Sequence, residues 1–183
     1  MAEEQVVVSG FGRCGSTLLM RMLDAGGVPI HAANPVSYET PDVLTPEGWL
    51  RVDGAAKGLF PYLPPPNLPR PAATIWLDRN LREQTRSHAK MSRLFLRRPL
   101  TRAQRRAWTL SLRRDRPKAL RRLRSVGRVL QTMFEDLLEF PRNTSTTIAE
   151  FLRLDLDVEA MASIVDPRSA RCTPDLRREF AHG

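Results

Sequence analysis

Short apolar runs separate longer amphipathic segments along this chain. Residues 5–10 read QVVVSG, a valine-rich run that ends in glycine, and residues 72–77 read AATIWL. Uninterrupted runs of this length predict strands that are buried on both faces of a parallel sheet. Residues 55–57 and 128–134 are two further strand candidates, the second of them reading RVLQTMF.

Apolar residues at helical spacing follow the first two long runs. A helix is expected over residues 15–25, and the pair Gly26-Gly27 ends it. The apolar face of that helix carries Leu18, Leu19, Met22 and Leu23. A second helix is expected over residues 80–91.

The second half of the chain also favours helices. We expect the leucine-bearing segment after residue 92 to be helical but broken at Pro99 and Pro117, with Thr101 as an N-cap. Asn143 or Thr144 can cap a last helix, whose apolar face carries Ile148, Phe151 and Leu152. Strands that alternate with helices predict an α/β fold of three layers, in which helices flank a central parallel sheet.

The length of 183 residues predicts a single domain. Within it we expect a basic helical insert or lid over 92–126, proline-rich loops over 28–53 and 60–71, and an irregular tail over 166–183. No apolar run is long enough to span a membrane, and the acidic start differs from a signal peptide. Two cysteines make no disulfide framework, and three scattered histidines make no metal site. We therefore expect a cytoplasmic protein without a metal.

The positive charge is concentrated in one segment. Residues 93–124 hold 13 Arg or Lys and one acid, Asp115, so their net charge is +12 and the remainder of the +9 chain carries 9 − 12 = −3. The favoured interpretation is a solvated outer face of helices, and an acceptor-recognition lid is the second. Nucleic-acid binding is disfavoured, because Trp108 and Phe95 are the only large planar side chains of the segment.

The first strand leads into a glycine-rich loop before the first helix. This loop, Gly10 to Thr17, has the spacing Gly-x4-Gly-Ser-Thr. Gly12 and Gly15 let the backbone approach an anion, and the N–H groups of the helix start point at the same spot. Arg13 can add a charge-assisted hydrogen bond. The loop therefore predicts a site for a nucleotide-like anion, and a glycine-rich turn without a ligand is the alternative.

The loop departs from two well-known anion loops. A Walker A motif has Lys before its last Ser/Thr, whereas this chain has Ser16 there and its cation, Arg13, three residues earlier. An ordinary ATPase or GTPase is therefore disfavoured. The distance from Cys14 to Arg21 is not the C-x5-R spacing of a phosphatase loop, so that reading fails as well.

The same residues resemble the sulfotransferase family, which uses 3′-phosphoadenylyl sulfate (PAPS) and has a P-loop-like fold. The resemblance implies that Gly12, Arg13, Cys14, Gly15, Ser16 and Thr17 bind the 5′-phosphosulfate. It also implies that Arg79, after the 72–77 strand, and Ser87, eight residues later, bind the 3′-phosphate. The alternative is a surface ion pair for Arg79 and a solvent-facing Ser87.

A third match is Phe134-Glu135-Asp136-Leu137, which resembles the family's late strand and turn, followed by Ile148 to Leu152. These residues are expected to be structural. The family's late Arg-Lys-Gly loop has no clear copy here, and Arg168 or Arg171 is a candidate substitute.

The resemblance implies sulfuryl transfer to a hydroxyl or amine of a small-molecule, glycan or lipid acceptor. Arg13 would act on the leaving phosphate, and Lys57 either stabilises the sulfuryl oxygens or is merely exposed. Many members have Lys-x-His at this point, but here Leu59 stands in place of the His. Glu39 is the first candidate for the general base, with a solvated loop acid as its alternative role, and Asp42 and His31 are weaker candidates.

Three other functions stay open at this point. A non-catalytic nucleotide-binding protein of the same fold is favoured by the missing His at position 59. A P-loop-like small-molecule kinase is disfavoured by the missing Walker lysine. A basic nucleic-acid-binding domain rests on the arginine-rich segment alone.

Overall fold

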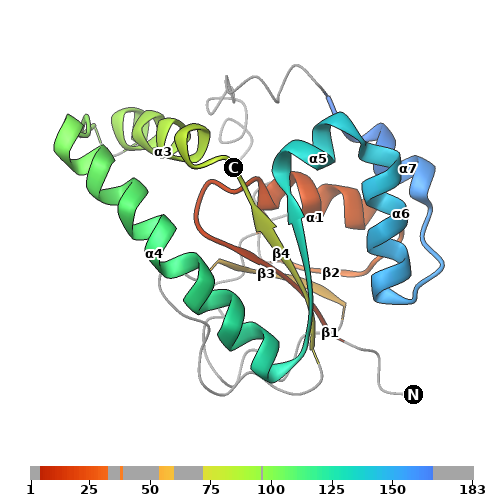
Figure 1. The fold of residues 1–183 in the computed structure, drawn as a ribbon. Helices are drawn as coiled ribbons and strands as arrows, with labels where there is room; N and C mark the ends of the chain where they lie inside the picture. The colour runs from red at the N-terminus through yellow and green to blue at the C-terminus, as the bar shows by residue number, and fades with distance from the viewer. Residues whose placement is uncertain (1–4, 33–37, 39–53, 60–71, 96, 167–183) are drawn as a thin grey trace.

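The computed structural model of the chain describes residues 5–32, 38, 54–59, 72–95 and 97–166. A five-stranded parallel sheet lies between two layers of helices (Figure 1). In spatial order its strands are β2 (Ile30–His31), β3 (Ala55–Leu59), β1 (Gln5–Gly10), β4 (Ala72–Asp78) and β5 (Arg128–Met133). The predicted three-layer α/β fold is confirmed.

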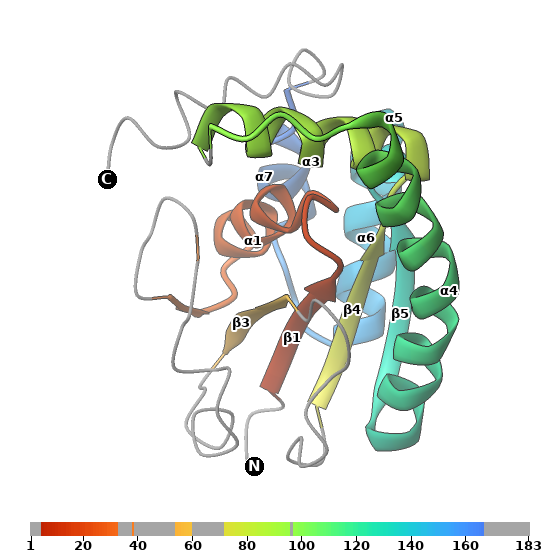
Figure 2. The ribbon, with the colours of Figure 1, turned by 90° about the vertical axis from the view of Figure 1, so that its left-hand side faces the viewer.

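Different helices cover the two faces of the sheet. One face carries α1 (Ser16–Ala25), α5 (Phe134–Glu139), α6 (Pro141–Leu152) and α7 (Val158–Ser163). The other face carries the long helix α4 (Arg102–Val126). Figure 2 shows α3 (Leu81–Phe95) lying across the end of the sheet to which the strands point.

The alternation of side chains along β1 produces two separate cores. Val6 and Val8 pack toward α1, whereas Val7 points to the opposite face and packs toward α4. Trp76 on the neighbouring strand β4 joins Val7, and the α4 residues of this second core are Leu112, Ala119, Leu120 and Leu123. Because both faces are covered, all three valines of the strand are buried, as its sequence predicts.

The four predicted strands and the first two predicted helices are confirmed, with small differences in their bounds. Strand β2 and helices α5 and α7 were not predicted from the sequence. These three elements have two, six and six residues, too short to show a clear periodicity.

The predicted break at Pro117 is wrong. Helix α4 runs without interruption from Arg102 to Val126 and includes Pro117, although the break before it, at Pro99, is confirmed. A proline costs an internal helix about 3 kcal/mol because it has no N–H to donate. Burial of Leu112, Leu120 and Leu123 on the sheet outweighs this cost, since a buried leucine side chain contributes about 1.5–3 kcal/mol.

The predicted cap of the last long helix is also wrong. Helix α6 begins at Pro141, two to three residues before Asn143 and Thr144. Proline suits the first turn of a helix, because the N–H that it lacks has no helical partner there. The Thr144 hydroxyl instead donates to the Asp136 carbonyl at 3.1 Å, which ties α6 to α5.

The basic segment forms the end of α3, a connection and α4. Its predicted N-cap is confirmed, since Thr101 and Gln104 form a reciprocal capping box at the start of α4. Most arginines of α4 are exposed while Leu112, Leu120 and Leu123 are buried, which fits the solvated-face interpretation. Leu110 of the same helix is 54% exposed.

Candidate anion-binding site

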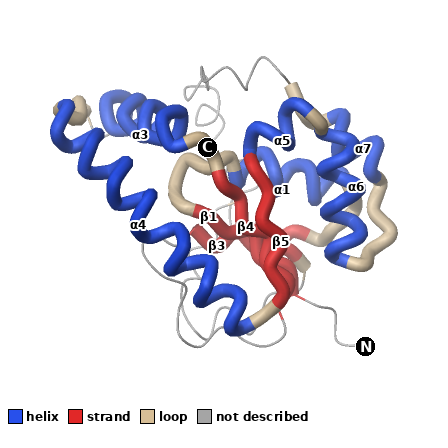
Figure 3. Tube along the Cα trace, viewed as in Figure 1, coloured by secondary structure: helices blue, strands red, loops and turns tan. Residues whose placement is uncertain are grey.

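The loop between β1 and α1 turns back on itself at the carboxyl end of the sheet (Figure 3). The Cys14 N–H donates to the Phe11 carbonyl at 3.1 Å, and Arg13 and Gly15 both have positive φ, 71° and 101°. Gly15 is the N-cap of α1, so the first N–H groups of α1 have no partner within the helix. The helix adds about half a positive charge at this point.

Glycine is required at position 15 for two reasons. Its φ of 101° lies in the left-handed region, and a Cβ atom there would lie 2.1 Å from Cδ2 of Phe134. The ring of Phe134, at the start of α5, thus packs directly on the backbone of the loop. The 134–137 match found in the sequence therefore forms part of the site's support.

The Cys14 side chain belongs to the core of the protein. It is fully buried below the loop, and burial raises the pKa of its thiol. A neutral, buried thiol is not a nucleophile, which agrees with the rejection of a phosphatase reading. The Cys14 N–H is already engaged by the Phe11 carbonyl, so a contact of Cys14 with an anion stays a prediction.

The structure brings the other predicted site residues together around this loop. Lys57 on β3 is only 5% exposed, and its Nζ donates to Thr17 Oγ1 at 3.2 Å. Arg79, directly after β4, donates from Nη1 to the Arg13 carbonyl at 3.3 Å. The Arg79 guanidinium also lies 4.5 Å from the centre of the Phe134 ring.

A hydrogen bond joins the loop to α3. Arg13 Nε donates to Ser87 Oγ at 3.1 Å, although the two residues are 74 positions apart. Arg79 and Ser87 are 6% and 2% exposed, so the alternative of a surface ion pair and a solvent-facing serine is wrong. Three side-chain cations, two hydroxyls and a helix N-terminus thus meet at one place, an arrangement that favours a polyanionic ligand.

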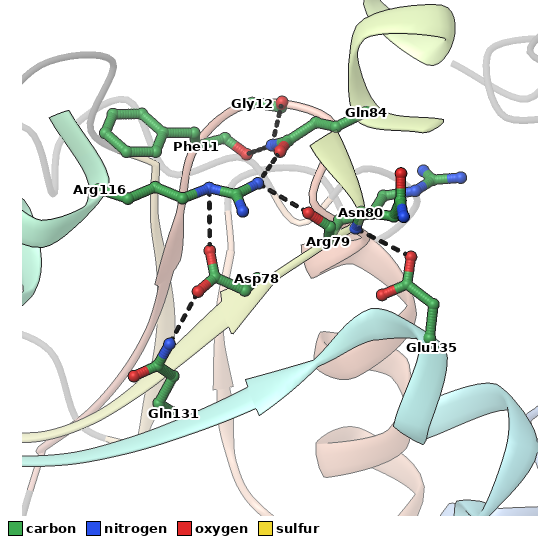
Figure 4. Close-up of polar contacts among 9 residues, drawn as sticks. All are labelled: Phe11, Gly12, Asp78, Arg79, Asn80, Gln84, Arg116, Gln131 and Glu135. Carbon is green, nitrogen blue, oxygen red and sulfur yellow. Dashed lines mark hydrogen bonds and ion pairs between the residues drawn. The ribbon is translucent and has the colours of Figure 1, made fainter. Parts of the chain in front are cut away.

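Four residues beneath this site form a polar network that we call the Arg116 cluster: Asp78, Gln84, Arg116 and Gln131 (Figure 4). Gln84 Nε2 donates to the Phe11 and Gly12 carbonyls, both at 3.0 Å. Arg116 of α4 forms an ion pair from Nε to Asp78 Oδ1 at 3.1 Å. The cluster connects the loop, β4, α3 and α4.

The sequence interpretation missed the Arg116 cluster. One signal was available for Arg116. The buried apolar residues of α4 stand at 112, 119, 120 and 123, and position 116 falls on the same helical stripe. A cation on an apolar stripe indicates a buried partner, which Asp78 provides.

His88 lies beside the site. Its ring stacks on Trp108 of α4 with centroids 4.2 Å apart and planes 10° apart. Burial, and secondly the positive charge of Arg13, lower the pKa of His88 below its ordinary value of 6.5. The imidazole is therefore predominantly neutral at pH 7.

Several predicted residues lie outside the described part of the chain. These are Glu39, Asp42, Arg168 and Arg171. His31 lies on β2, where it pairs with Ala56, the neighbour of Lys57 on β3. Among the described residues there is no group of three His, Cys, Asp or Glu that could hold a metal ion. No described helix is long and apolar enough to cross a membrane.

A cavity of about 430 Å³ lies elsewhere, between the second half of α3 and the start of α4. Residues of the ranges 89–94 and 99–105 line it, and none comes from the loop. The candidate site is therefore assigned from the residues around the loop and not from this cavity.

No protein-family model and no curated protein matches the sequence. Among solved structures, the fold is similar to that of mouse sulfotransferase SULT7A1 complexed with PAP, with a TM-score of 0.58 and 17% identity. The match covers 91% of this chain and 63% of that chain, so the chain spans less than two thirds of its neighbour. At this identity the likeness establishes the fold, a P-loop-like α/β fold of the sulfotransferase type.

Proposed function

We propose that the chain binds PAPS and transfers its sulfuryl group to a hydroxyl or amine of a small-molecule, glycan or lipid acceptor. The observation that carries this proposal is the Arg13–Ser87 hydrogen bond at 3.1 Å. It joins the loop suited to a 5′-phosphosulfate with the α3 segment suited to a 3′-phosphate. The PAP complex of the SULT7A1 neighbour supports the same ligand class.

The reaction needs charge stabilisation more than covalent chemistry. The bond from sulfur to the 5′-phosphate oxygen breaks, and a new bond forms from sulfur to the acceptor oxygen or nitrogen. The leaving product is adenosine 3′,5′-bisphosphate (PAP). Arg13 and the loop N–H groups would stabilise the leaving phosphate, and Lys57 would stabilise the sulfuryl oxygens. The burial of Lys57 beside Thr17 favours this role over that of an exposed surface lysine.

A general base must take the proton of the acceptor. Glu39 remains the first candidate, and His31 is the described alternative because β2 places it on the strand next to Lys57. Glu39→Gln should abolish most turnover while the affinity for PAP stays unchanged, because only the proton acceptor is lost. His31→Gln serves as the comparison. Full activity of the Glu39→Gln variant rejects Glu39 as the base.

The first experiment measures which ligand stabilises the protein. Thermal unfolding is followed with PAP, ATP and a DNA duplex, since a ligand at 100 times its dissociation constant adds about 2.7 kcal/mol. Stabilisation by PAP and not by ATP is the expected result. Arg79→Met should weaken PAP binding, whereas Arg82→Met, an exposed arginine three residues later, should leave it intact. Equal effects of both variants contradict the assignment of Arg79.

A non-catalytic nucleotide-binding protein is the second candidate function, favoured by Leu59 in place of the family's His. Both functions predict that PAP stabilises the protein against thermal unfolding. They differ in whether sulfate is transferred from PAPS to an acceptor. Transfer of labelled sulfate from PAPS to acceptor mixtures establishes the enzyme. Tight PAP binding without transfer to any hydroxyl or amine acceptor favours the non-catalytic protein.

A further inference from the structure

One arginine of the basic helix α4 is turned toward the candidate site. The Arg116 side chain is 16% exposed and its ion-pair partner Asp78 8%, whereas Arg113 on the same helix is exposed. Position 116 lies on the stripe of α4 that packs on the sheet. The charge of Arg116 is therefore compensated by Asp78 inside the molecule, whereas most other arginines of α4 are exposed.

The Arg116 guanidinium makes one ion pair and two hydrogen bonds. Nε lies 3.1 Å from Asp78 Oδ1, and Nη2 donates to the Arg79 carbonyl at 2.7 Å and to Gln84 Oε1. Gln131 Nε2 donates to the second Asp78 oxygen at 2.9 Å, which fixes the carboxylate (Figure 4). Asp78 thus fixes the guanidinium on one side. On its other side the guanidinium binds the Arg79 backbone and the Gln84 side chain.

The chemistry of Arg116 decides the orientation of Gln84. A guanidinium only donates hydrogen bonds, so the amide oxygen of Gln84 must face it. The amide NH2 group then faces the loop, where it donates to the Phe11 and Gly12 carbonyls at 3.0 Å each. A flipped amide would place its oxygen against two carbonyl oxygens and its nitrogen against the guanidinium.

We propose that Arg116 is a positioning residue for the nucleotide, and that it sets the loop of Arg13 and the backbone of Arg79 in one fixed relative arrangement. It acts on the loop through Gln84 and on the 3′-phosphate segment through the Arg79 carbonyl. This inference rests on the proposed function for its ligand. Its consequence is that a helix outside the family's phosphate-binding motifs controls the affinity for PAP.

The test compares Arg116→Lys and Arg116→Met with the control Arg113→Met. Lysine keeps the charge that Asp78 requires, so the protein folds, but a single Nζ atom cannot occupy the positions of both Nε and Nη2. We expect Arg116→Met to raise the Kd for PAP about 10- to 100-fold, by analogy with residues that orient the ligands of a metal ion. Arg116→Lys should raise it about 10-fold, and Arg113→Met should change it less than about twofold.

Two readouts separate positioning from general destabilisation. The effects of Arg116→Met and Gln84→Leu on the Kd should not add, because both remove the same link to the loop. In the ligand-free protein, hydrogen exchange of the loop amides, including that of Cys14, should accelerate in Arg116→Lys while amides of β1 stay protected.

The outcomes distinguish this inference from the proposed function. If the unaltered protein is not stabilised by PAP, the proposed function fails, and accelerated loop exchange in Arg116→Lys still supports positioning. If PAP binds and Arg116→Lys matches Arg113→Met in both Kd and loop exchange, the positioning role is overturned. Additive effects of Arg116→Met and Gln84→Leu overturn it as well.

Discussion

Replacement of Gly15 by alanine tests the local structure on which the site depends. The loop needs a left-handed backbone at this position, with a φ of 101°. The new methyl group would also lie 2.1 Å from Cδ2 and 2.4 Å from Cε2 of Phe134. Because Phe134 is 8% exposed and part of the core, its ring has little room to move away.

The expected cost has two parts. A non-glycine residue in the left-handed region costs about 1–2 kcal/mol. Overpacking against a core side chain costs typically 1–3 kcal/mol. Their sum, about 2–5 kcal/mol, lowers the melting temperature of a protein of this size by roughly 4–20 °C.

The assay is denaturant unfolding of Gly15→Ala followed by circular dichroism, with Gly12→Ala as the matched control. A Cβ atom at position 12 would have no neighbour within 4 Å, so that variant should keep the stability of the unaltered protein. The double variant Gly15→Ala with Phe134→Ala should be less destabilised than the sum of its single changes, because the clash is gone.

A clear result would refute this reasoning. If Gly15→Ala unfolds within about 0.5 kcal/mol of the unaltered protein, the range typical of harmless surface changes, neither the left-handed turn nor the contact with Phe134 limits the loop. If the single effects add in the double variant, the clash is not the cause.

Three further variants probe other parts of the structure. Thr101→Ala removes the side-chain oxygen that accepts from the Gln104 N–H and should lower the free energy of unfolding by about 1 kcal/mol; no loss contradicts the capping box. Pro117→Ala restores an N–H directed at the Arg113 carbonyl in an exposed part of α4, and should raise the free energy of unfolding by about 2 kcal/mol; a lower melting temperature contradicts it. The pKa of His88 is lowered on folding, so the unfolded chain binds the proton first and stability falls as the pH drops from 6.5 through the folded-state pKa. His88→Gln should flatten this part of the stability profile, and an unchanged slope excludes His88 as its source.

The sequence alone determined the local parts of the candidate site. The strand at 5–10, the turn at Gly15 and the start of α1 were all predicted, because each depends on residues within a short window. Valines fit a strand covered on both faces, and glycine tolerates a left-handed turn. The choice of Arg79 and Ser87 needed the family resemblance, since their spacing alone is compatible with an exposed helix face.

The arginine-rich segment shows where the sequence was insufficient. Its composition does not reveal which of 13 cations is buried, because the rotation of α4 depends on Trp76 and Val7 from distant parts of the chain. The same packing carries the helix through Pro117 against the local preference for a break. Local propensity amounts to a few kcal/mol at most, and the burial of a whole helix face exceeds it.

The residue types in the loop thus sufficed to predict an anion site after the first strand. Only the tertiary structure decided that Lys57 lies against Thr17, that Arg13 reaches Ser87, and that Arg116 holds the loop from below. These contacts join segments 37 to 74 residues apart. Such contacts form because parallel strands bring their carboxyl ends to one edge of the sheet, a geometry that no short stretch of sequence contains.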